Sequence, residues 1–293
     1  MGMTATLRWR AQLSPRPLAN ILFYPKTLSP SGSNYARERM YDPLELAEVV
    51  ARDVVRERDA VEERKYYRFR GGRWYGGIAT ADCVGCNLRC RFCWSWRVRD
   101  NYKRVGRFYP PERVSNSLKS IASKRGYRLV RISGGEPTLS WKHLLAVIEA
   151  VEEEGLYFVL ETNGILIGAR KEYARDLSRF DRVHVRVSLK GASGEEFSML
   201  TGARPEGFEL QLRALEHLVE SGVSCNPAVM LSFSEEESVE RLLRRLAEID
   251  RALLEEFEPE YVILYMHVRE LLKRYGLKPR RYFTPFDYPS EFV

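Results

Sequence analysis

The spacing of apolar residues changes between helical and alternating several times along the chain, and each change predicts an element. Between residues 42 and 59, apolar side chains recur on one helical face after Asp42 and Pro43, which predicts a capped helix. The next stretch, KYYRFRGGRWYGGIAT at 65–80, contains two aromatic runs around a Gly-Gly turn. This pattern predicts a β-hairpin whose second strand leads directly into the segment that follows.

Beyond residue 110 the chain alternates between helical and strand patterns. Helical spacing is found at 111–124, 141–155, 168–179, 207–221 and from about 235 onward. Strand patterns are found at 127–133, 157–164, 183–191, 225–233 and 261–268. Two helix starts are predicted from caps, at Ser140 and at the capping box formed by Ser234 and Glu237.

Counted from the second hairpin strand, six strands alternate with helices. Such alternation predicts right-handed βαβ units, a parallel sheet and helices on the outside. The pattern fits a curved, incomplete barrel and an open doubly wound sheet equally well, but both place the site at the carboxyl ends of the strands. Residues 1–41, rich in proline, are expected to form irregular structure over the surface.

Composition narrows the class of protein. The chain has 293 residues, 44% of them hydrophobic, which suffices for one large domain with a full core. It contains no apolar run of about 18 residues and no signal-peptide pattern, so we expect a cytoplasmic protein without membrane contact. The formal charge of +7 permits an acidic partner, and basic residues concentrate between Arg89 and Arg107, either as a solvated loop or as a substrate-facing surface.

Four of the five cysteines lie in CVGCNLRCRFC, residues 83–93, immediately after the first parallel strand. Cys86, Cys90 and Cys93 have the spacing C-x3-C-x2-C, which suits three ligands of an iron–sulfur cube with one iron left open. With Cys83 included, a four-cysteine zinc site is an alternative, although zinc knuckles are usually separated by a dozen or more residues. A fully ligated electron-transfer cluster is another alternative. The fifth cysteine, Cys225, is expected in the core.

Three further motifs follow consecutive strands: GGEP at 134–137, ETNG at 161–164 and SLKG at 188–191. Together with the cysteine run, they make the chain resemble the radical S-adenosylmethionine (SAM) superfamily over roughly residues 74–268. The C-x3-C-x2-C run and GGEP correspond to that family's first and second motifs. The resemblance implies a partial (β/α)6 TIM-like barrel, with an N-terminal extension at 1–70, the core at 71–268 and a short C-terminal extension at 269–293.

The resemblance also implies a role for individual residues. Cys86, Cys90 and Cys93 would ligate a 4Fe-4S cluster whose fourth iron binds the amino and carboxylate groups of S-adenosylmethionine. The remaining cofactor contacts would come from Phe92 at adenine, from Gly134, Gly135 and Glu136 at the methionine amino group, and from Thr162, Asn163, Ser188 and Lys190 at ribose and carboxylate. The implied activity is that of an iron–sulfur oxidoreductase, in which a 5'-deoxyadenosyl radical abstracts hydrogen from a substrate. The electron would come from a ferredoxin- or flavodoxin-like donor.

The substrate is left open by the sequence. GGEP and ETNG most resemble the branch that contains glycyl-radical-enzyme activating enzymes and 7-carboxy-7-deazaguanine synthase. One hypothesis is therefore hydrogen abstraction from a protein or peptide, and a second is radical modification of a nucleoside, RNA or small metabolite. A third is an iron–sulfur or zinc protein without catalytic activity.

Four aromatic or imidazole side chains complete the predictions. Trp94 and Trp96 follow the cysteine loop and are expected to cover the cluster against water, with stacking on a substrate base as the alternative. Tyr265 and His267 alternate in the last predicted strand, so they are expected on one face of it, in the core. Cys83 falls outside the three-cysteine spacing, and replacing it by serine should leave a SAM-cleaving cluster.

Overall fold

A computed structural model of the chain describes residues 26–27 and 40–287. Within these residues one sheet has nine strands, in the order β10-β9-β8-β7-β6-β4-β3-β2, with β5 paired to β3. The six parallel strands are β4 (Ile78–Cys83), β6 (Leu129–Ser133), β7 (Tyr157–Thr162), β8 (Val183–Leu189), β9 (Cys225–Met230) and β10 (Glu258–Glu260). Because β10 and β2 end the order without pairing, the sheet is an open, partial barrel, as predicted.

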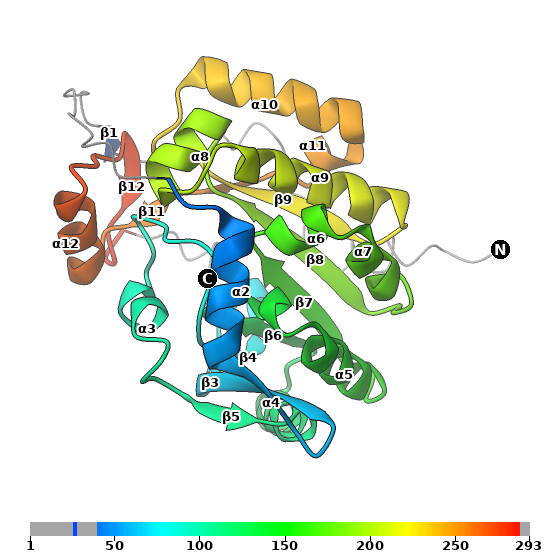
Figure 1. Ribbon diagram of the computed structural model, residues 1–293. Helices are drawn as coiled ribbons and strands as arrows, with labels where there is room; N and C mark the ends of the chain where they lie inside the picture. Colours follow the sequence, from blue (N-terminus) through cyan, green and yellow to red (C-terminus); the bar gives the residue numbers. More distant parts are fainter. Residues whose placement is uncertain (1–25, 28–39, 288–293) are drawn as a thin grey trace.

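Helices that connect the parallel strands cover one face of this sheet (Figure 1). They are α4 (Pro111–Arg125), α5 (Trp141–Glu152), α6 (Ile165–Ala169), α7 (Lys171–Leu177), α8 (Gly194–Thr201), α9 (Glu206–Glu220), α10 (Glu236–Ile249) and α11 (Ala252–Glu255). Their apolar stripes pack on alternate strand residues, for example Leu144, Val147 and Ile148 of α5 in one core cluster with Val130 and Ile132 of β6. We call this side of the sheet the outer face.

The opposite side, here called the inner face, is polar. Strand registers align its residues in rows: Asp82 lies beside Ser133, and Arg186 lies between Glu161 and Asn226. Near the amino ends of the strands this face instead carries a small apolar cluster of Ile78, Leu129 and Val159, on which Trp74 and Tyr75 pack. A barrel with charged residues buried on its inner face has an interior suited to polar ligands.

Three antiparallel strands extend the sheet beyond β4. They are β2 (Val55–Arg58), β3 (Val61–Gly72) and β5 (Arg107–Tyr109), and a short 3-10 turn, η2 (Trp74–Gly76), joins β3 to β4. The predicted hairpin is confirmed, but Gly71 and Gly72 lie in the strand rather than in the turn. The domain boundary expected at residue 70 falls inside β3, which pairs with β4 of the core from Tyr66 to Gly72.

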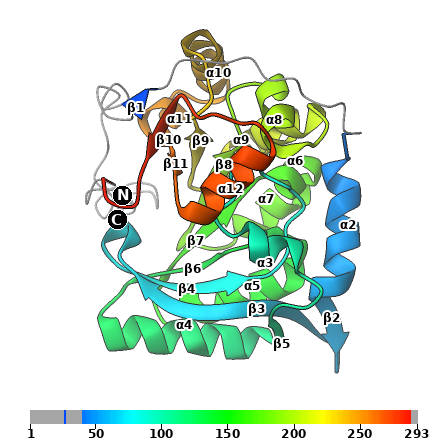
Figure 2. The ribbon, with the colours of Figure 1, turned by 90° about the vertical axis from the view of Figure 1, so that its left-hand side faces the viewer.

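The predicted last strand at 261–268 is wrong in its bounds. The sixth parallel strand is β10, and the chain continues as β11 (Val262–Ile263) and the helix α12 (Met266–Arg274). β11 pairs with β12 (Arg281–Phe283) and β12 with β1 (Lys26–Thr27), which form a separate small sheet. Figure 2 looks onto the inner side of the main sheet, where α12 and α3 (Trp96–Asp100) lie in front of it.

Other predictions are corrected in detail. Helix α2 (Pro43–Val54) has the Asp42 cap, since the Asp42 carboxylate accepts a hydrogen bond from the Leu44 amide, but it ends at Val54 where β2 begins. The capping box at Ser234 is not formed, because the Ser234 hydroxyl donates to Glu196 instead. Ser140 precedes α5, but its hydroxyl donates to Glu62 rather than capping the helix.

Two remaining points concern the ends of the chain and the membrane. The expectation of irregular structure at residues 1–41 lies almost wholly outside the described residues, as do the last six positions of the C-terminal extension. Among the described helices, none combines the length and the apolar character needed to cross a bilayer.

Candidate functional site

The four strand-end motifs meet at the carboxyl end of the parallel sheet. The cysteine loop follows β4, GGEP follows β6, ETNG closes β7 and SLKG closes β8. Because these strands are parallel neighbours in the order β8-β7-β6-β4, their last residues lie side by side. Helix α2 supports the cysteine loop from outside, where Val50 and Val54 leave room at Gly85 for a glycine only.

Three of the loop's thiols form a connected group. A negative charge on Cys90 would raise the pKa of Cys86, and a charge on Cys93 would raise that of Cys90, so the three sulfurs are electrostatic neighbours in sequence order. N–H groups surround the Cys86 sulfur: the Leu88 amide lies 3.4 Å from Sγ and the Asn163 side-chain nitrogen 3.8 Å. Donors of this kind stabilise thiolates bound to iron.

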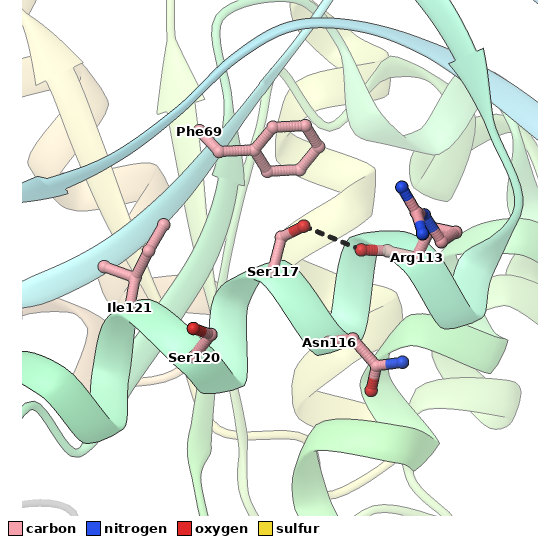
Figure 3. Close-up of a pocket in the computed structure, with 6 residues that line it drawn as sticks. All are labelled: Phe69, Arg113, Asn116, Ser117, Ser120 and Ile121. Atoms are coloured by element: carbon pink, nitrogen blue, oxygen red, sulfur yellow. Dashed lines mark hydrogen bonds between the residues drawn. The ribbon is translucent and has the colours of Figure 1, made fainter.

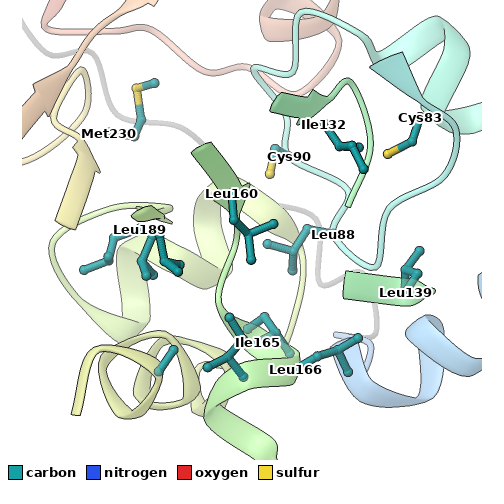
Figure 4. Close-up of a cluster of buried hydrophobic side chains, with 14 of the residues drawn as sticks. Cys83, Leu88, Cys90, Ile132, Leu139, Leu160, Ile165, Leu166, Leu189 and Met230 are labelled. Atoms are coloured by element: carbon teal, nitrogen blue, oxygen red, sulfur yellow. The ribbon is translucent and has the colours of Figure 1, made fainter. Parts of the chain in front are cut away.

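Cys83 lies apart from this group. It is buried at the end of β4, and its electrostatic neighbours are Arg64, Glu136 and Asp82 rather than the other thiols. The Gly135 amide offers its sulfur a hydrogen bond. Figure 4 draws Cys83 and Cys90 in the buried apolar cluster around the loop, together with Leu88 and Leu139.

Within the described residues, no three or more His, Cys, Asp or Glu side chains lie close enough together to hold one metal ion. Thiolates on one tetrahedral zinc ion would each lie about 2.3 Å from it, whereas thiolates that bind different irons of a cube lie farther apart from one another. The zinc alternative and the cluster therefore require different spacings of the sulfur atoms.

Burial makes the Cys86 and Cys90 thiols poor anions unless a cation or metal is bound. It raises the pKa of Cys86 to about 12 and that of Cys90 to about 11, against an ordinary thiol value of 9. Two cationic side chains, Lys190 and Arg99, act in the opposite direction at Cys90. In addition, the side-chain nitrogen of Asn87 in the same loop is buried and has no hydrogen-bond partner within residues 40–287. A buried donor and buried thiols in one loop fit an iron–sulfur group.

Glu136 of GGEP joins two strand-end motifs. One of its carboxylate oxygens accepts from the Thr162 hydroxyl at 2.6 Å and the other from the Asn163 amide at 2.8 Å. The first oxygen also accepts from the amide and hydroxyl of Thr138, while the Glu136 amide donates to the Gly85 carbonyl at 2.8 Å. Glu136 therefore links the GGEP, ETNG and cysteine loops, and its place near the cofactor's amino group stays a prediction.

Gly134 and Gly135 have no room for side chains. Gly134 has a φ of 86°, and a Cβ added at Gly135 would lie 2.2 Å from the Gly85 carbonyl oxygen. Both positions therefore require glycine, one for its conformation and one for the close approach of the GGEP and cysteine loops. The GGEP loop and the cysteine loop are therefore in direct backbone contact at the rim.

Ser188 and Lys190 lie at the end of β8, where the Lys190 ammonium donates to the Ser188 hydroxyl. That hydroxyl donates in turn to Glu260, which also binds Arg186 at 2.7 Å. The Arg186 and Lys190 charges hold the pKa of the Glu260 carboxyl below its usual value, although burial opposes them. Lys190 thus lies between the Cys90 thiol and a carboxylate pair on the inner face.

Gln211 is a site residue that sequence reasoning missed. Its side-chain nitrogen donates to the Asn163 carbonyl at 2.6 Å and to the Ser188 carbonyl at 2.9 Å, and its oxygen accepts from the Lys190 amide. It therefore links the ETNG and SLKG loops, as Glu136 links GGEP and ETNG. A fully polar side chain on the apolar stripe of α9 was the signal that could have found it.

The aromatic residues after the cysteines divide into two groups. Phe92 is buried and packs on Phe233, with ring centroids 6.1 Å apart. Trp94 is exposed, whereas the Trp96 indole donates to the His267 carbonyl at 3.0 Å and His267 contacts the Trp94 carbonyl at 2.8 Å. Helix α12 is thereby fastened onto the cysteine segment.

The core position expected for Tyr265 and His267 is wrong. The strand ends before them, Tyr265 is exposed, and its ring stacks on the His267 ring at the start of α12. Cys225, also expected in the core, is half-buried at the first position of β9.

Three of the basic residues between Arg89 and Arg107 donate hydrogen bonds to backbone oxygens inside the protein. Arg99 is buried and donates to the Cys90 carbonyl at 2.8 Å, and Arg89 donates to the Cys86 carbonyl at 2.6 Å. Arg91 donates to the Met199 carbonyl at 2.9 Å. Arg89 and Arg99 thus hold the cysteine loop through backbone oxygens. Arg97, Lys103, Arg104 and Arg107 are exposed, and for them the two interpretations, solvated loop and substrate-facing surface, stay open.

A groove elsewhere on the surface does not belong to this site. It lies along α4 and is lined by Phe69, Arg113, Asn116, Ser117, Ser120 and Ile121 (Figure 3). Its floor is the outer side of β3, so it is separated from the inner face by the sheet itself.

Comparisons with known proteins agree with this geometry. The model of the Radical SAM superfamily matches residues 82–246. The probable GTP 3',8-cyclase of Thermococcus kodakarensis is 30% identical over 174 residues, 59% of this chain and 53% of that protein. The GTP 3',8-cyclase of Helicobacter pylori is 29% identical over 161 residues, 54% of this chain and 48% of that protein.

Among solved structures, Streptococcus suis SuiB bound to S-adenosylmethionine superposes with a TM-score of 0.51 at 20% identity. The superposition covers 73% of this chain and 47% of SuiB. At that identity the likeness concerns the fold alone. The chain spans about half the length of the curated relatives it matches.

Proposed function

The chain belongs to the radical SAM superfamily, and we propose that Cys86, Cys90 and Cys93 hold its 4Fe-4S cluster and that S-adenosylmethionine binds at the adjoining strand ends. The observation that carries this proposal is the linkage of the four loops. Buried Glu136 and Gln211 tie the GGEP, ETNG and SLKG loops to one another, next to three electrostatically coupled thiols. Such a rim holds a cofactor in a fixed orientation.

A bound, reduced 4Fe-4S cluster would supply the electron for reductive cleavage of S-adenosylmethionine, the source of the 5'-deoxyadenosyl radical that abstracts hydrogen in this chemistry. The chain's own residues would orient and enclose that chemistry. Backbone groups at Gly134 and Gly135 would receive the methionine amino group, and Lys190 would offer a charge-assisted partner to the carboxylate. Phe92 excludes water on the adenine side, because its ring is buried against Phe233.

For the substrate we propose a nucleotide or a similar phosphate-bearing molecule rather than a protein or peptide. Support comes from the relatives named for GTP and from the polar character of the inner face, on which charged side chains are buried. Because the chain spans only half of those relatives, the proposal extends to the substrate class and not to their cyclisation reaction. An acidic ferredoxin- or flavodoxin-like donor in the cytoplasm completes the proposed cycle.

The first experiment is anaerobic reconstitution followed by dithionite, S-adenosylmethionine and measurement of 5'-deoxyadenosine. Wild type is expected to form it, and serine variants of Cys86, Cys90 or Cys93 are expected to lose it with most of their bound iron. Cys83→Ser and Cys225→Ser serve as matched controls that retain both. Absence of 5'-deoxyadenosine from reconstituted wild type would refute the enzymatic proposal, and loss of the cluster in Cys83→Ser would refute the assignment of ligands.

The second experiment tests the substrate class. Addition of GTP is expected to raise 5'-deoxyadenosine formation above the level reached with S-adenosylmethionine alone, and guanosine without phosphates is expected to raise it less. Equal stimulation by both compounds, or none by either, would contradict the proposed class.

A further inference from the structure

A β-bulge at Tyr67 decides which way the arginines of β3 point. Tyr66 pairs with Cys83 and Arg68 with Asp82, so β3 has one residue more than β4 between these pairs. Without the extra residue, Arg68 would face the outer helices, because one position of register exchanges the two faces of a strand. The bulge leaves Tyr66 and Phe69 stacked on the outer side and turns Arg68 and Arg70 toward Asp82 on the inner face.

The Asp82 carboxylate accepts hydrogen bonds from the guanidinium groups of both Arg68 and Arg70. Arg68 donates through Nε at 2.6 Å and Arg70 through Nε at 2.8 Å, both to the same carboxylate oxygen. Arg70 adds a second bond from a terminal nitrogen at 3.2 Å. Asp82 is completely buried, whereas the Arg68 side chain is 45% exposed. One carboxylate therefore fixes two cations, and the pair carries a net positive charge toward solvent.

Two other arginines of the inner face, Arg131 and Arg186, form ion pairs with carboxylates of the protein. Arg131 binds Glu161 and the Thr80 hydroxyl, and Arg186 binds both Glu258 and Glu260. Their side chains are 6% and 11% exposed. By contrast, the two terminal nitrogens of Arg68 have no hydrogen-bond partner among residues 40–287, while Nε holds them in place. The Tyr67 ring supports the same guanidinium from one side, with 5.4 Å between the guanidinium carbon and the ring centroid.

This pair lies beside the strand-end rim. A Cβ placed on Gly134 would come within 3.1 Å of the Asp82 side chain and 3.2 Å of the Tyr67 ring. The Cβ of Asp82, the residue that orients the arginines, thus lies against the GGEP loop, and Asp82 immediately precedes the cysteine loop in the chain. An anion bound by Arg68 would lie at the mouth of the same inner face as the cofactor.

We propose that Arg68, with Arg70 and their support Asp82, is a binding site for a phosphate group of the substrate. The inference rests on the proposed function, since it assigns the substrate's anionic part to that site. A phosphate has three acceptor oxygens for the terminal nitrogens of two neighbouring guanidinium groups, and arginine forks bind such oxygens in pairs. The one rival source of a suitable anion is the carboxylate of S-adenosylmethionine.

Binding measurements on the anaerobically reconstituted protein distinguish the two sources. Isothermal titration would use tripolyphosphate, GTP and S-adenosylmethionine separately, with wild type, Arg68→Gln, Arg68→Lys and Arg244→Gln. Arg244, an exposed residue of α10 in the outer layer, is the matched control for loss of one positive charge. Arg68→Gln is expected to weaken tripolyphosphate and GTP by roughly tenfold or more, Arg68→Lys by less, and Arg244→Gln by under about twofold.

The affinity for S-adenosylmethionine is expected to change by less than about twofold in every variant. Unchanged affinity for tripolyphosphate and GTP in Arg68→Gln would overturn the proposal, as would failure of wild type to bind either. If Arg68→Gln weakens the binding of S-adenosylmethionine alone, the site binds the cofactor's carboxylate, and the proposal is overturned in that case as well. None of these titrations requires turnover, so they fail independently of the 5'-deoxyadenosine assay. If Arg68→Gln does not fold, Arg68→Lys keeps the charge and carries the test alone.

Discussion

The contact between Gly135 and the cysteine loop gives a sharp test of how the rim is built. An alanine at this position would place its Cβ 2.2 Å from the Gly85 oxygen and 3.1 Å from the Cys83 oxygen. Both neighbours are backbone atoms, so the loop would have to retreat by about 1 Å to reach an ordinary carbon–oxygen separation. The same movement stretches the 2.8 Å hydrogen bond between the Glu136 amide and the Gly85 carbonyl.

We expect Gly135→Ala to destabilise the protein by about 2–4 kcal/mol, because overpacking costs roughly 1–3 kcal/mol and the strained hydrogen bond about 1 more. Cys86 follows Gly85 directly, so iron content after reconstitution and affinity for S-adenosylmethionine should both fall. Urea denaturation, iron analysis and calorimetric titration measure the three effects.

Gly72→Ala is the matched control for this substitution. It adds the same methyl group in a position where the nearest atoms lie 3.4 Å away or farther, so it should leave all three quantities near wild type. If Gly135→Ala equals Gly72→Ala in stability, iron content and cofactor affinity, then the close approach of the two loops does not position the site.

Two further predictions concern buried polar groups. The Glu136 carboxylate accepts four hydrogen bonds, and in Glu136→Gln the amide must turn two N–H groups toward protein donors. This substitution should lower the free energy of unfolding by about 2–4 kcal/mol and weaken cofactor binding. Glu149→Gln, at an exposed position of α5, is the control and should do neither. Burial lowers the pKa of His143 and of His184 to about 4 in the folded protein. Between pH 6.5 and 4 the unfolded chain therefore binds more protons than the folded protein, so the free energy of unfolding should fall as the pH drops through that window. In His143→Gln, the fall in the free energy of unfolding between pH 7 and 4, measured by urea denaturation, should be smaller than in wild type by about 1–3 kcal/mol. An equal fall in both proteins would exclude His143 as a source of the pH dependence.

Much of the fold follows from local pattern. Apolar spacing located α4, α5 and α9 within a few residues, and the strands β6, β7 and β8 appear where branched apolar runs end in small polar motifs. Periodicity reports one element at a time, however. It missed α6 and α8, which are short, and it extended the last strand into α12, since Tyr265 to Val268 alternates in polarity without belonging to a sheet.

The sequence by itself determined the chemistry of the rim. Three cysteines at C-x3-C-x2-C and three glycine-containing motifs after consecutive strands specify which chemical groups reach one edge, because parallel strands must end together. The family follows from those spacings, which are local properties of the chain. The same spacings predict that Cys83 is separate from the other three cysteines of the loop.

Only the tertiary structure decided what each polar side chain does there. Glu136 and Gln211 bind loops that are distant in sequence, and no spacing rule distinguishes such a residue from a ligand contact. The bulge at Tyr67 is the clearest case, since strict alternation would place Arg68 and Tyr66 on the same face. Pairing with β4 inserts one residue and reverses that orientation. Side-chain direction depends on register between strands, and register is a property of the folded sheet rather than of either segment alone.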